Sequence, residues 1–189
     1  MNDTPSAPAA RRVVLYALMS LDGFADDPGR SDWLADTGNG IGEFLAATIA
    51  TQDAVLLGRR TYEMWAPYWP TAQVQPFADF INSTPKHVFI SSARELEWAQ
   101  SIRVAEPAAP YVAALKARTG GDIGIHGSLS LARTLLAADL VDEIRIVLAP
   151  SLAGHGTRLF GDDDKLHRFE LVESGRSGGC VLLHYRNRS

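Results

Sequence analysis

The sequence contains a single cysteine, Cys180, and no stretch that approaches the roughly 18 apolar residues of a membrane-spanning helix. A lone cysteine excludes an internal disulfide and a Cys-x-x-Cys metal clamp, so Cys180 is expected to pack as a small hydrophobic residue. The first dozen residues also lack the apolar run of a signal peptide. Together these absences predict a soluble protein of the cytoplasm.

Positive charge is not in excess either. Lysine and arginine number 18 against 22 aspartates and glutamates, which gives a formal net charge of -4. A protein with this balance is not expected to bind nucleic acid or an anionic membrane, although a local basic cluster can still hold a phosphate. The five histidines form no H-E-x-x-H pair, and the one G-x-S-x-G match, at residues 175–179, lies in a predicted closing hairpin and not between a strand and a helix, so neither a metal site nor a serine hydrolase is expected. The expected partner is a small-molecule substrate.

With 189 residues, 46% of them hydrophobic, the chain has the size and composition of one globular domain. Short apolar runs alternate with helical patterns from Val13 onward, which is typical of an α/β domain. Residues 1–11 are expected to be a loose tail and residues 12–189 the domain. The pattern predicts strands at 13–18, 54–57, 87–90, 102–104, 123–125 and 143–148, helices at 43–51, 60–65, 77–81 and 112–117, a helix capped by Ser128, and a closing hairpin at 169–172 and 181–185.

Three of the predicted strands end in glycine, hydroxyl or basic residues: Gly58, Arg59, Arg60 and Thr61 after the second, Ser91, Ser92 and Arg94 after the third, and Gly127 and Ser128 after the strand at 123–125. In an open α/β sheet the carboxyl ends of the strands converge on one ligand site. Glycine and a helix N-terminus bring backbone N–H groups close to an anion, and arginine adds charge, so this combination favours phosphate. Each motif taken singly is more often a plain turn or helix cap.

The common nucleotide fingerprints are absent from the chain. Gly121, Gly124 and Gly127 do not form G-x-G-x-x-G after the first strand, and G-x-x-x-x-G-K-[ST] does not occur. A nucleotide site therefore implies a different fold.

Several motifs follow one another along the chain: Ser20-Leu21-Asp22-Gly23, Ser31-Asp32-Trp33, the G-R-x-T-x-E pattern from Gly58 to Glu63, the strand from Lys86 to Ser92, Gly127-Ser128-Leu129, and the segment from Leu140 to Phe160. In this order they resemble the dihydrofolate reductase-like superfamily, specifically the branch of the riboflavin-biosynthesis reductase domain and its stand-alone relatives. The resemblance extends from about Val13 to the C-terminus. It implies a three-layer α/β/α fold whose central, mostly parallel sheet ends in a C-terminal antiparallel hairpin.

The same resemblance implies an NADPH-dependent reductase that forms a homodimer. Carried over residue by residue, it assigns the adenosine side of the cofactor to Gly58, Arg59 and Thr61, the 2′-phosphate to Ser91 and Ser92, the pyrophosphate to Gly127, Ser128, Leu129 and Ser130, and the nicotinamide to the neighbourhood of Ala17. Arg60 is a further cofactor-binding candidate. The residue chemistry agrees, because adjacent arginines and serines suit a 2′-phosphate dianion, whereas an NAD site normally places an acid on the ribose.

Hydride transfer to an acceptor also requires a proton. Asp22, directly after the first strand, is the candidate donor, alone or through a water that it orients. The alternative is that Asp22-Gly23 is simply a turn.

The candidate substrate-binding residues are Trp33, Glu43, His126 and Phe160. Glu43 is close in order to the folate-binding acid of dihydrofolate reductases, yet a first-turn acid favoured by the helix dipole explains it more simply. His126 is either a proton donor near neutral pH or a structural hydrogen-bonding residue. Trp33, Trp65, Tyr68 and Trp69 either stack on a flat heterocycle or belong to the core.

Two departures from the family pattern concern the substrate. His126-Gly127-Ser128 stands where riboflavin-pathway reductases have E-G-G, and Met64-Trp65-Ala66-Pro67 stands where they have an acidic D-x-P. The expected acceptor is therefore described only as a small conjugated heterocycle, pterin-like or aminopyrimidine-like. The missing acids support an alternative function, a catalytically inactive NADP(H)-binding module. The run Asp162-Asp163-Asp164 is interpreted as a solvated loop.

Overall fold

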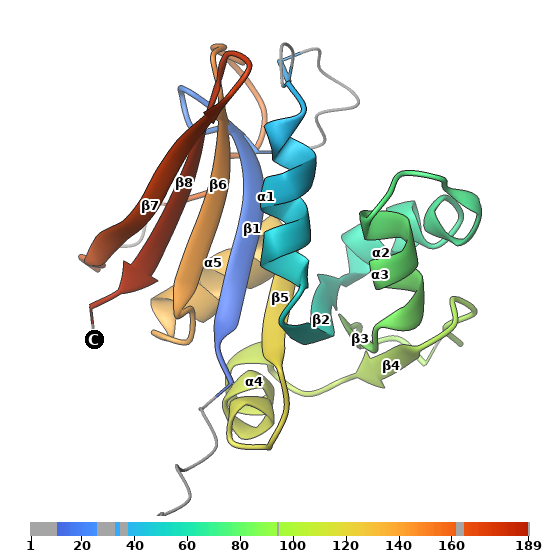
Figure 1. The fold of residues 1–189 in the computed structure, drawn as a ribbon. Helices are drawn as coiled ribbons and strands as arrows, with labels where there is room; N and C mark the ends of the chain where they lie inside the picture. The colour runs from blue at the N-terminus through green and yellow to red at the C-terminus, as the bar shows by residue number, and fades with distance from the viewer. Residues whose placement is uncertain (1–10, 26–32, 35–37, 94, 162–164, 189) are drawn as a thin grey trace, which may run out of the picture.

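A computed structural model describes residues 11–25, 33–34, 38–93, 95–161 and 165–188 of the chain. Eight strands form one sheet in the order β4-β3-β2-β5-β1-β6-β8-β7 (Figure 1). They are β1 (Val13–Ser20), β2 (Gln52–Gly58), β3 (Lys86–Phe89), β4 (Ser101–Val104), β5 (Asp122–His126), β6 (Glu143–Ala149), β7 (Phe169–Ser177) and β8 (Cys180–Asn187). The first six strands pair in parallel, whereas β8 runs antiparallel to both β6 and β7. The predicted parallel sheet with a closing antiparallel hairpin is thus confirmed.

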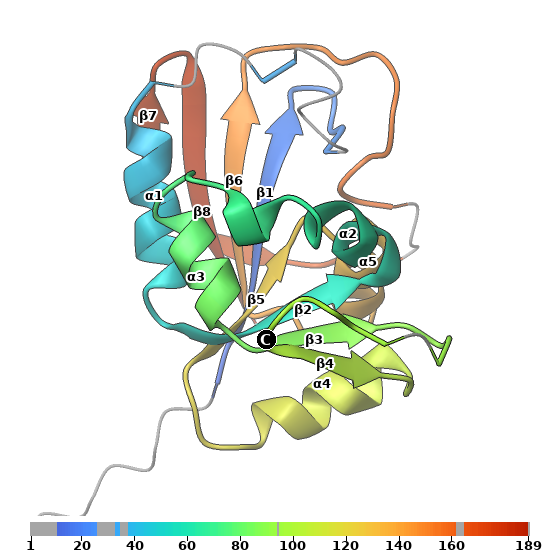
Figure 2. The same ribbon diagram turned by 90° about the vertical axis from the view of Figure 1, so that its right-hand side faces the viewer.

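Helices cover both faces of this sheet, as Figures 1 and 2 show. The helices are α1 (Gly40–Ile49), α2 (Arg59–Trp65), α3 (Phe77–Ser83), α4 (Ala108–Lys116) and α5 (Leu129–Ala137), with a short 3-10 helix, η1 (Trp69–Thr71). Buried residues of α4 and α5 pack with one face of the central strands, and buried residues of α1, α2 and α3 pack with the other. The three-layer α/β/α architecture follows.

Burial on both faces explains why β1 and β2 contain unbroken apolar runs, at residues 13–19 and 54–57. Leu15 and Ala17 of β1 belong to the core beneath α4 and α5, whereas Tyr16 packs with Val147 in the core beneath α1. All five residues of β5 are buried. The alternation of side chains along a strand therefore decides which face each site residue can reach.

The sequence prediction placed Arg11 in the loose N-terminal tail, and the structure corrects this. Its side chain is 6% exposed, its Nε donates to the carbonyl of Gly121 at 2.7 Å, and its guanidinium pairs with Asp53. Residues 1–10 lie outside the described residues, and Arg11 packs with the domain rather than belonging to a loose tail. The expected helix at 43–51 begins earlier, at Gly40.

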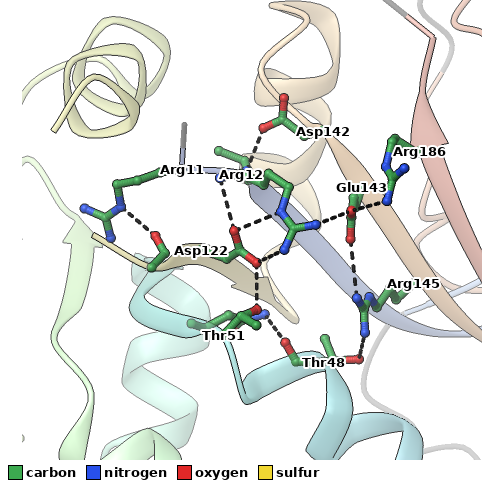
Figure 3. Close-up of polar contacts among 12 residues, drawn as sticks. Arg11, Arg12, Thr48, Thr51, Asp122, Asp142, Glu143, Arg145 and Arg186 are labelled. Atoms are coloured by element: carbon green, nitrogen blue, oxygen red, sulfur yellow. Dashed lines mark hydrogen bonds and ion pairs between the residues drawn. The ribbon is translucent and has the colours of Figure 1, made fainter. Parts of the chain in front are cut away.

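A network of ion pairs joins the amino ends of the central strands (Figure 3). Arg12, just before β1, lies 2.6 Å from Asp122 at the start of β5 and 2.8 Å from Glu143 at the start of β6. Glu143 is completely buried, and His184 Nε2 lies 2.9 Å from its other oxygen. Burial alone would raise the pKa of Glu143, but Arg12 and His184 together hold it below its usual value. The amino ends of these strands are therefore occupied by structural charge pairs.

Candidate functional site

At the opposite edge of the sheet, the segments that leave β2 and β5 are hydrogen-bonded to each other. The Gly58 N–H donates to Ser128 Oγ at 2.8 Å, the Ser128 hydroxyl donates to Thr61 Oγ1 at 2.9 Å, and the Thr61 hydroxyl contacts the Gly127 carbonyl at 3.3 Å. Residues nearly 70 positions apart in the sequence thus meet where α2 and α5 begin. The structure brings together the two glycine-containing strand ends that the sequence singled out.

These bonds change the expected chemistry of two hydroxyls. Ser128 occupies the N-cap position of α5 but makes no side-chain cap bond, because its hydroxyl bridges Gly58 and Thr61 instead. Ser128 and Thr61 are only 4% and 6% exposed. Their hydroxyls hold the two turns together, and the groups left for an anion are the backbone N–H donors of the first turns of α2 and α5.

Gly127 is required by this geometry. Its φ of +70° lies in the left-handed region, and a Cβ built on it would be 3.1 Å from Cζ2 of Trp65. Only glycine takes this backbone conformation without strain and leaves room for the tryptophan ring. The turn into α5 therefore has a fixed shape backed by Trp65.

Ser91 and Ser92 are exposed directly beyond β3, beside the Gly58 turn, since Gly58 and Phe89 are in register on adjacent strands. Arg103 of β4 binds this segment: its Nε donates to the Ser92 carbonyl at 2.7 Å and its Nη2 to the Ser91 carbonyl at 3.0 Å. Sequence reasoning missed Arg103, because no motif marks it and only the parallel pairing of β3 with β4 brings it to the serines.

The remaining predicted cofactor residues divide by exposure. Arg59 and Arg60 are exposed, and Arg59 is 2.7 Å from Glu63 one helical turn later. Ser130 is exposed in the first turn of α5, while Leu129 is partly buried against the core. Ala17 is 7% exposed and packs in the core beneath α5. Arg94 lies outside the described residues.

Asp22 is held by hydrogen bonds within the protein. Its carboxylate accepts the Ser20 hydroxyl at 2.6 Å, the Ala153 N–H at 3.0 Å and the Gly154 N–H at 2.8 Å. The Ser20 hydroxyl and the two N–H groups lower the pKa of Asp22 to about 2. The Asp22 carboxylate stays ionised and accepts these three hydrogen bonds. It thereby ties the turn after β1 to the segment after β6. This geometry favours the turn reading of Asp22 over the proton donor.

His126 lies inside the core, not at its edge. The residue is 2% exposed, and its ring centroid is 5.8 Å from Tyr16 and 5.2 Å from Phe77. Nε2 lies 2.8 Å from Gln52 Oε1, which as an amide oxygen accepts from the imidazole N–H. Burial lowers the pKa of His126 to about 3, so the ring is neutral near pH 7. Of the two alternatives, the structure supports the structural hydrogen-bonding residue.

The predicted substrate residues are not brought together. Trp33 is 6% exposed and packs with Val147 beneath α1, and its indole N–H has no hydrogen-bond partner among the described residues. Phe160 instead lines a groove of about 830 Å³ with Ile146, on the α5 side of the sheet. Because Ile146 and Val147 are consecutive residues of β6, they point to opposite faces. Trp33 and Phe160 therefore cannot wall the same pocket, and Glu43 is exposed on the first turn of α1.

The aromatic residues at the end of α2 and just after it belong mainly to the core. Trp65 and Trp69 make edge-on contacts with Phe77, with ring centroids 5.7 and 4.8 Å apart, and Tyr68 is 54% exposed. Within the described residues no group of three or more acidic, histidine or cysteine side chains is placed to hold a metal ion. No helix in that same part of the chain is long and apolar enough to cross a membrane.

Comparison with known proteins gives a consistent result. A family model described as the RibD C-terminal domain matches residues 11–183. The uncharacterized protein YyaP of Bacillus subtilis (strain 168) is 30% identical over 182 residues, which cover 93% of this chain and 94% of YyaP.

Two solved structures share the fold. A putative riboflavin biosynthesis protein from Shewanella sp. PV-4 superposes with a TM-score of 0.75 at 22% identity, covering 94% of this chain and 99% of that one. The dihydrofolate reductase of Enterococcus faecalis, solved in complex with NADP(H), gives a TM-score of 0.58 at 12% identity and covers 94% and 97% of the two chains. The fold is thus that of dihydrofolate reductase.

Proposed function

The chain belongs to the RibD C-terminal domain family, and from this premise we propose that it is a cytoplasmic, NADPH-dependent reductase. Its acceptor would be a small conjugated heterocycle, pterin-like or aminopyrimidine-like. Family and fold support a reductase-type domain, and the likeness to an NADP(H)-bound dihydrofolate reductase supports the choice of cofactor.

The observation that carries the proposal is the hydrogen-bonded junction of the Gly58–Thr61 and Gly127–Ser128 turns. A dinucleotide diphosphate needs backbone N–H donors that it can approach closely, and two helix N-termini separated by glycine turns provide them. The exposed Ser91–Ser92 segment lies next to this junction at the end of the neighbouring strand. The residues present therefore fit a phosphate-rich cofactor.

NADPH supplies the hydride when it is bound, and this chain's residues have to orient the cofactor and exclude water. Gly127 and the first turn of α5 would hold the pyrophosphate through backbone N–H groups. Gly58, Arg59, Arg60 and Thr61 would face the adenosine side, and Ser91 and Ser92 the 2′-phosphate. Ala17, in the second half of β1, is proposed for the nicotinamide side.

We further propose that the protein is a homodimer, as the family resemblance implies. The exposed apolar groove beside Phe160 is compatible with a second chain. Sedimentation equilibrium of the purified protein tests this: a mass of one chain at micromolar concentration contradicts it.

A second candidate function, an NADP(H)-binding module without catalysis, is favoured by one specific observation. Asp22 is ionised and tied to loop N–H groups, and His126 is neutral and buried. Neither Asp22 nor His126 carries a proton that it could donate near pH 7. A reductase with these residues would therefore take its proton from water.

Thermal unfolding with NADPH and with NADH separates the possibilities. A ligand at about 100 times its Kd adds roughly 2.7 kcal/mol to the free energy of unfolding, so preferential binding of NADPH gives a clear rise in Tm that NADH does not match. Equal effects, or none, would contradict both functions. Loss of NADPH absorbance on addition of pterins or aminopyrimidines then distinguishes the reductase from the binding module.

A further inference from the structure

Arg103 makes a two-point contact with the segment proposed to hold the 2′-phosphate. Its guanidinium donates through Nε to the carbonyl of Ser92 and through Nη2 to the carbonyl of Ser91, at 2.7 and 3.0 Å. Both serines and Arg103 are exposed. We propose that Arg103 sets the preference for NADPH over NADH, as a positioning residue that fixes the Ser91–Ser92 turn and adds a positive charge beside it. The inference rests on the proposed NADPH site.

The guanidinium suits this role because it is planar, permanently charged and carries five N–H donors. Two of these donors are used by the serine carbonyls. The rest of the group keeps its charge next to the serines, where a phosphate dianion attracts it more strongly than a ribose hydroxyl does. A lysine at this position would keep the charge but lacks the flat pair of donors that holds both carbonyls.

The sheet fixes where this guanidinium can lie. Val88 of β3 is in register with Arg103, and Phe89 with Val104, so β4 ends beside the segment that leaves β3. Gly58 is in register with Phe89 on the other side of β3. Strands β2, β3 and β4 lie side by side (Figure 2), so the Gly58 turn, the serine turn and Arg103 follow one another across three adjacent strands.

The other described arginines near this row, Arg59 and Arg60, have no hydrogen bond to Ser91 or Ser92 among the described residues. Arg59 is engaged by Glu63 on the same face of α2. Arg60 is exposed at the start of α2, a helix whose backbone N–H groups serve the adenosine side of the site. Arg103 is the described arginine that is bonded directly to both serine residues, so its removal should act on the 2′-phosphate and leave the rest of the cofactor unaffected.

The test compares the Kd of NADPH and NADH, by fluorescence titration, in the wild-type protein, Arg103→Met and Arg103→Lys. The matched control is Arg176→Met, because Arg176 is an exposed arginine whose Nε also donates to a backbone carbonyl, that of Gly178 at 2.8 Å, in the distant β7–β8 hairpin. We expect Arg103→Met to weaken NADPH by about tenfold or more, the effect of losing one charge-assisted contact, with NADH unchanged. Arg103→Lys should keep part of the preference for NADPH that Arg103→Met loses. Arg176→Met should have the wild-type ratio of the Kd for NADH to the Kd for NADPH.

Three results overturn the inference while leaving the proposed function intact. In each the wild-type protein prefers NADPH. In the first, Arg103→Met keeps the wild-type ratio of the two Kd values. In the second, Arg103→Met weakens NADPH and NADH equally, as a purely structural support of the loop would. In the third, Arg176→Met changes the ratio as much as Arg103→Met.

A wild-type protein without preference for NADPH overturns the proposed function itself. Should Arg103→Met fold poorly, Arg103→Lys alone still decides, because a ratio equal to that of the wild type contradicts the need for a two-point contact.

Discussion

Gly127 and Gly154 offer a matched pair of glycine substitutions that tests the turn at the proposed pyrophosphate site. Both have left-handed backbone, with φ of +70° and +74°. A Cβ at Gly154 meets nothing within 4 Å, whereas a Cβ at Gly127 would be 3.1 Å from the Trp65 ring. Alanine in this backbone region costs about 1–2 kcal/mol at either position. The Trp65 ring packs edge-on against Trp69 and Phe77 and cannot easily move, so overpacking should add about 1–3 kcal/mol at Gly127 alone.

The measurement is urea unfolding of both variants, followed by NADPH titration under native conditions. Gly154→Ala should lose about 1–2 kcal/mol of unfolding free energy and keep the wild-type Kd for NADPH. Gly127→Ala should lose about 2–5 kcal/mol and bind NADPH at least tenfold more weakly, because the first turn of α5 must shift to accommodate the methyl group. Equal stability and equal NADPH affinity of the two variants would refute the reasoning, since the contact with Trp65 would then have no energetic consequence.

Three further substitutions test individual side chains. Asp22→Asn should lower Tm but leave the shape of the pH–activity profile unchanged, because the pKa of Asp22 is already about 2; a profile that loses a limb would restore Asp22 as proton donor. Glu143→Gln should cost about 3–5 kcal/mol in urea unfolding at pH 7, as expected when a buried ion pair loses one partner, whereas the exposed Glu170→Gln should cost under about 0.5 kcal/mol. Because the folded-state pKa of Glu143 is lowered, its stabilising effect should be present above about pH 4.5 and disappear as the pH falls further. A difference in unfolding free energy between the wild type and Glu143→Gln that persists at low pH would contradict this expectation. Burial lowers the pKa of Lys86 to about 8 from 10.5, so wild-type stability should rise between these pH values, and Lys86→Met should remove that rise; an identical slope in the variant would contradict it.

The layout of the fold was predictable because the central strands are buried on both faces. Residues 13–19 of β1 and 54–57 of β2 are apolar runs of strand length bounded by polar or glycine residues, and such runs have few alternatives. The junction between the Gly58 and Gly127 turns was predictable for a related reason, since parallel strands place their carboxyl ends at one edge.

The chemistry of individual side chains was less predictable, because it depends on contacts between distant segments. Ser128 has the sequence position of a helix cap, yet its hydroxyl bonds to Gly58 and Thr61 on another strand. Asp22 becomes a loop anchor only through N–H groups more than 130 residues later. Phe160 and Trp33 separate onto opposite faces through the alternation of β6, which a motif comparison does not register.

The amino and carboxyl ends of the strands form two edges of the sheet that differ in the charged groups they carry. Asp122 and Glu143 are neutralised by arginines at the amino ends of β5 and β6, whereas the carboxyl ends carry glycine turns, helix N-termini and exposed arginines. Strand β1 has eight residues, which at about 3.3 Å each separate the two edges by roughly 26 Å. Exposed charges are largely screened beyond a Debye length of about 8 Å at physiological salt. The acids that pair at the amino edge are therefore both compensated and out of range of an anionic cofactor at the carboxyl edge.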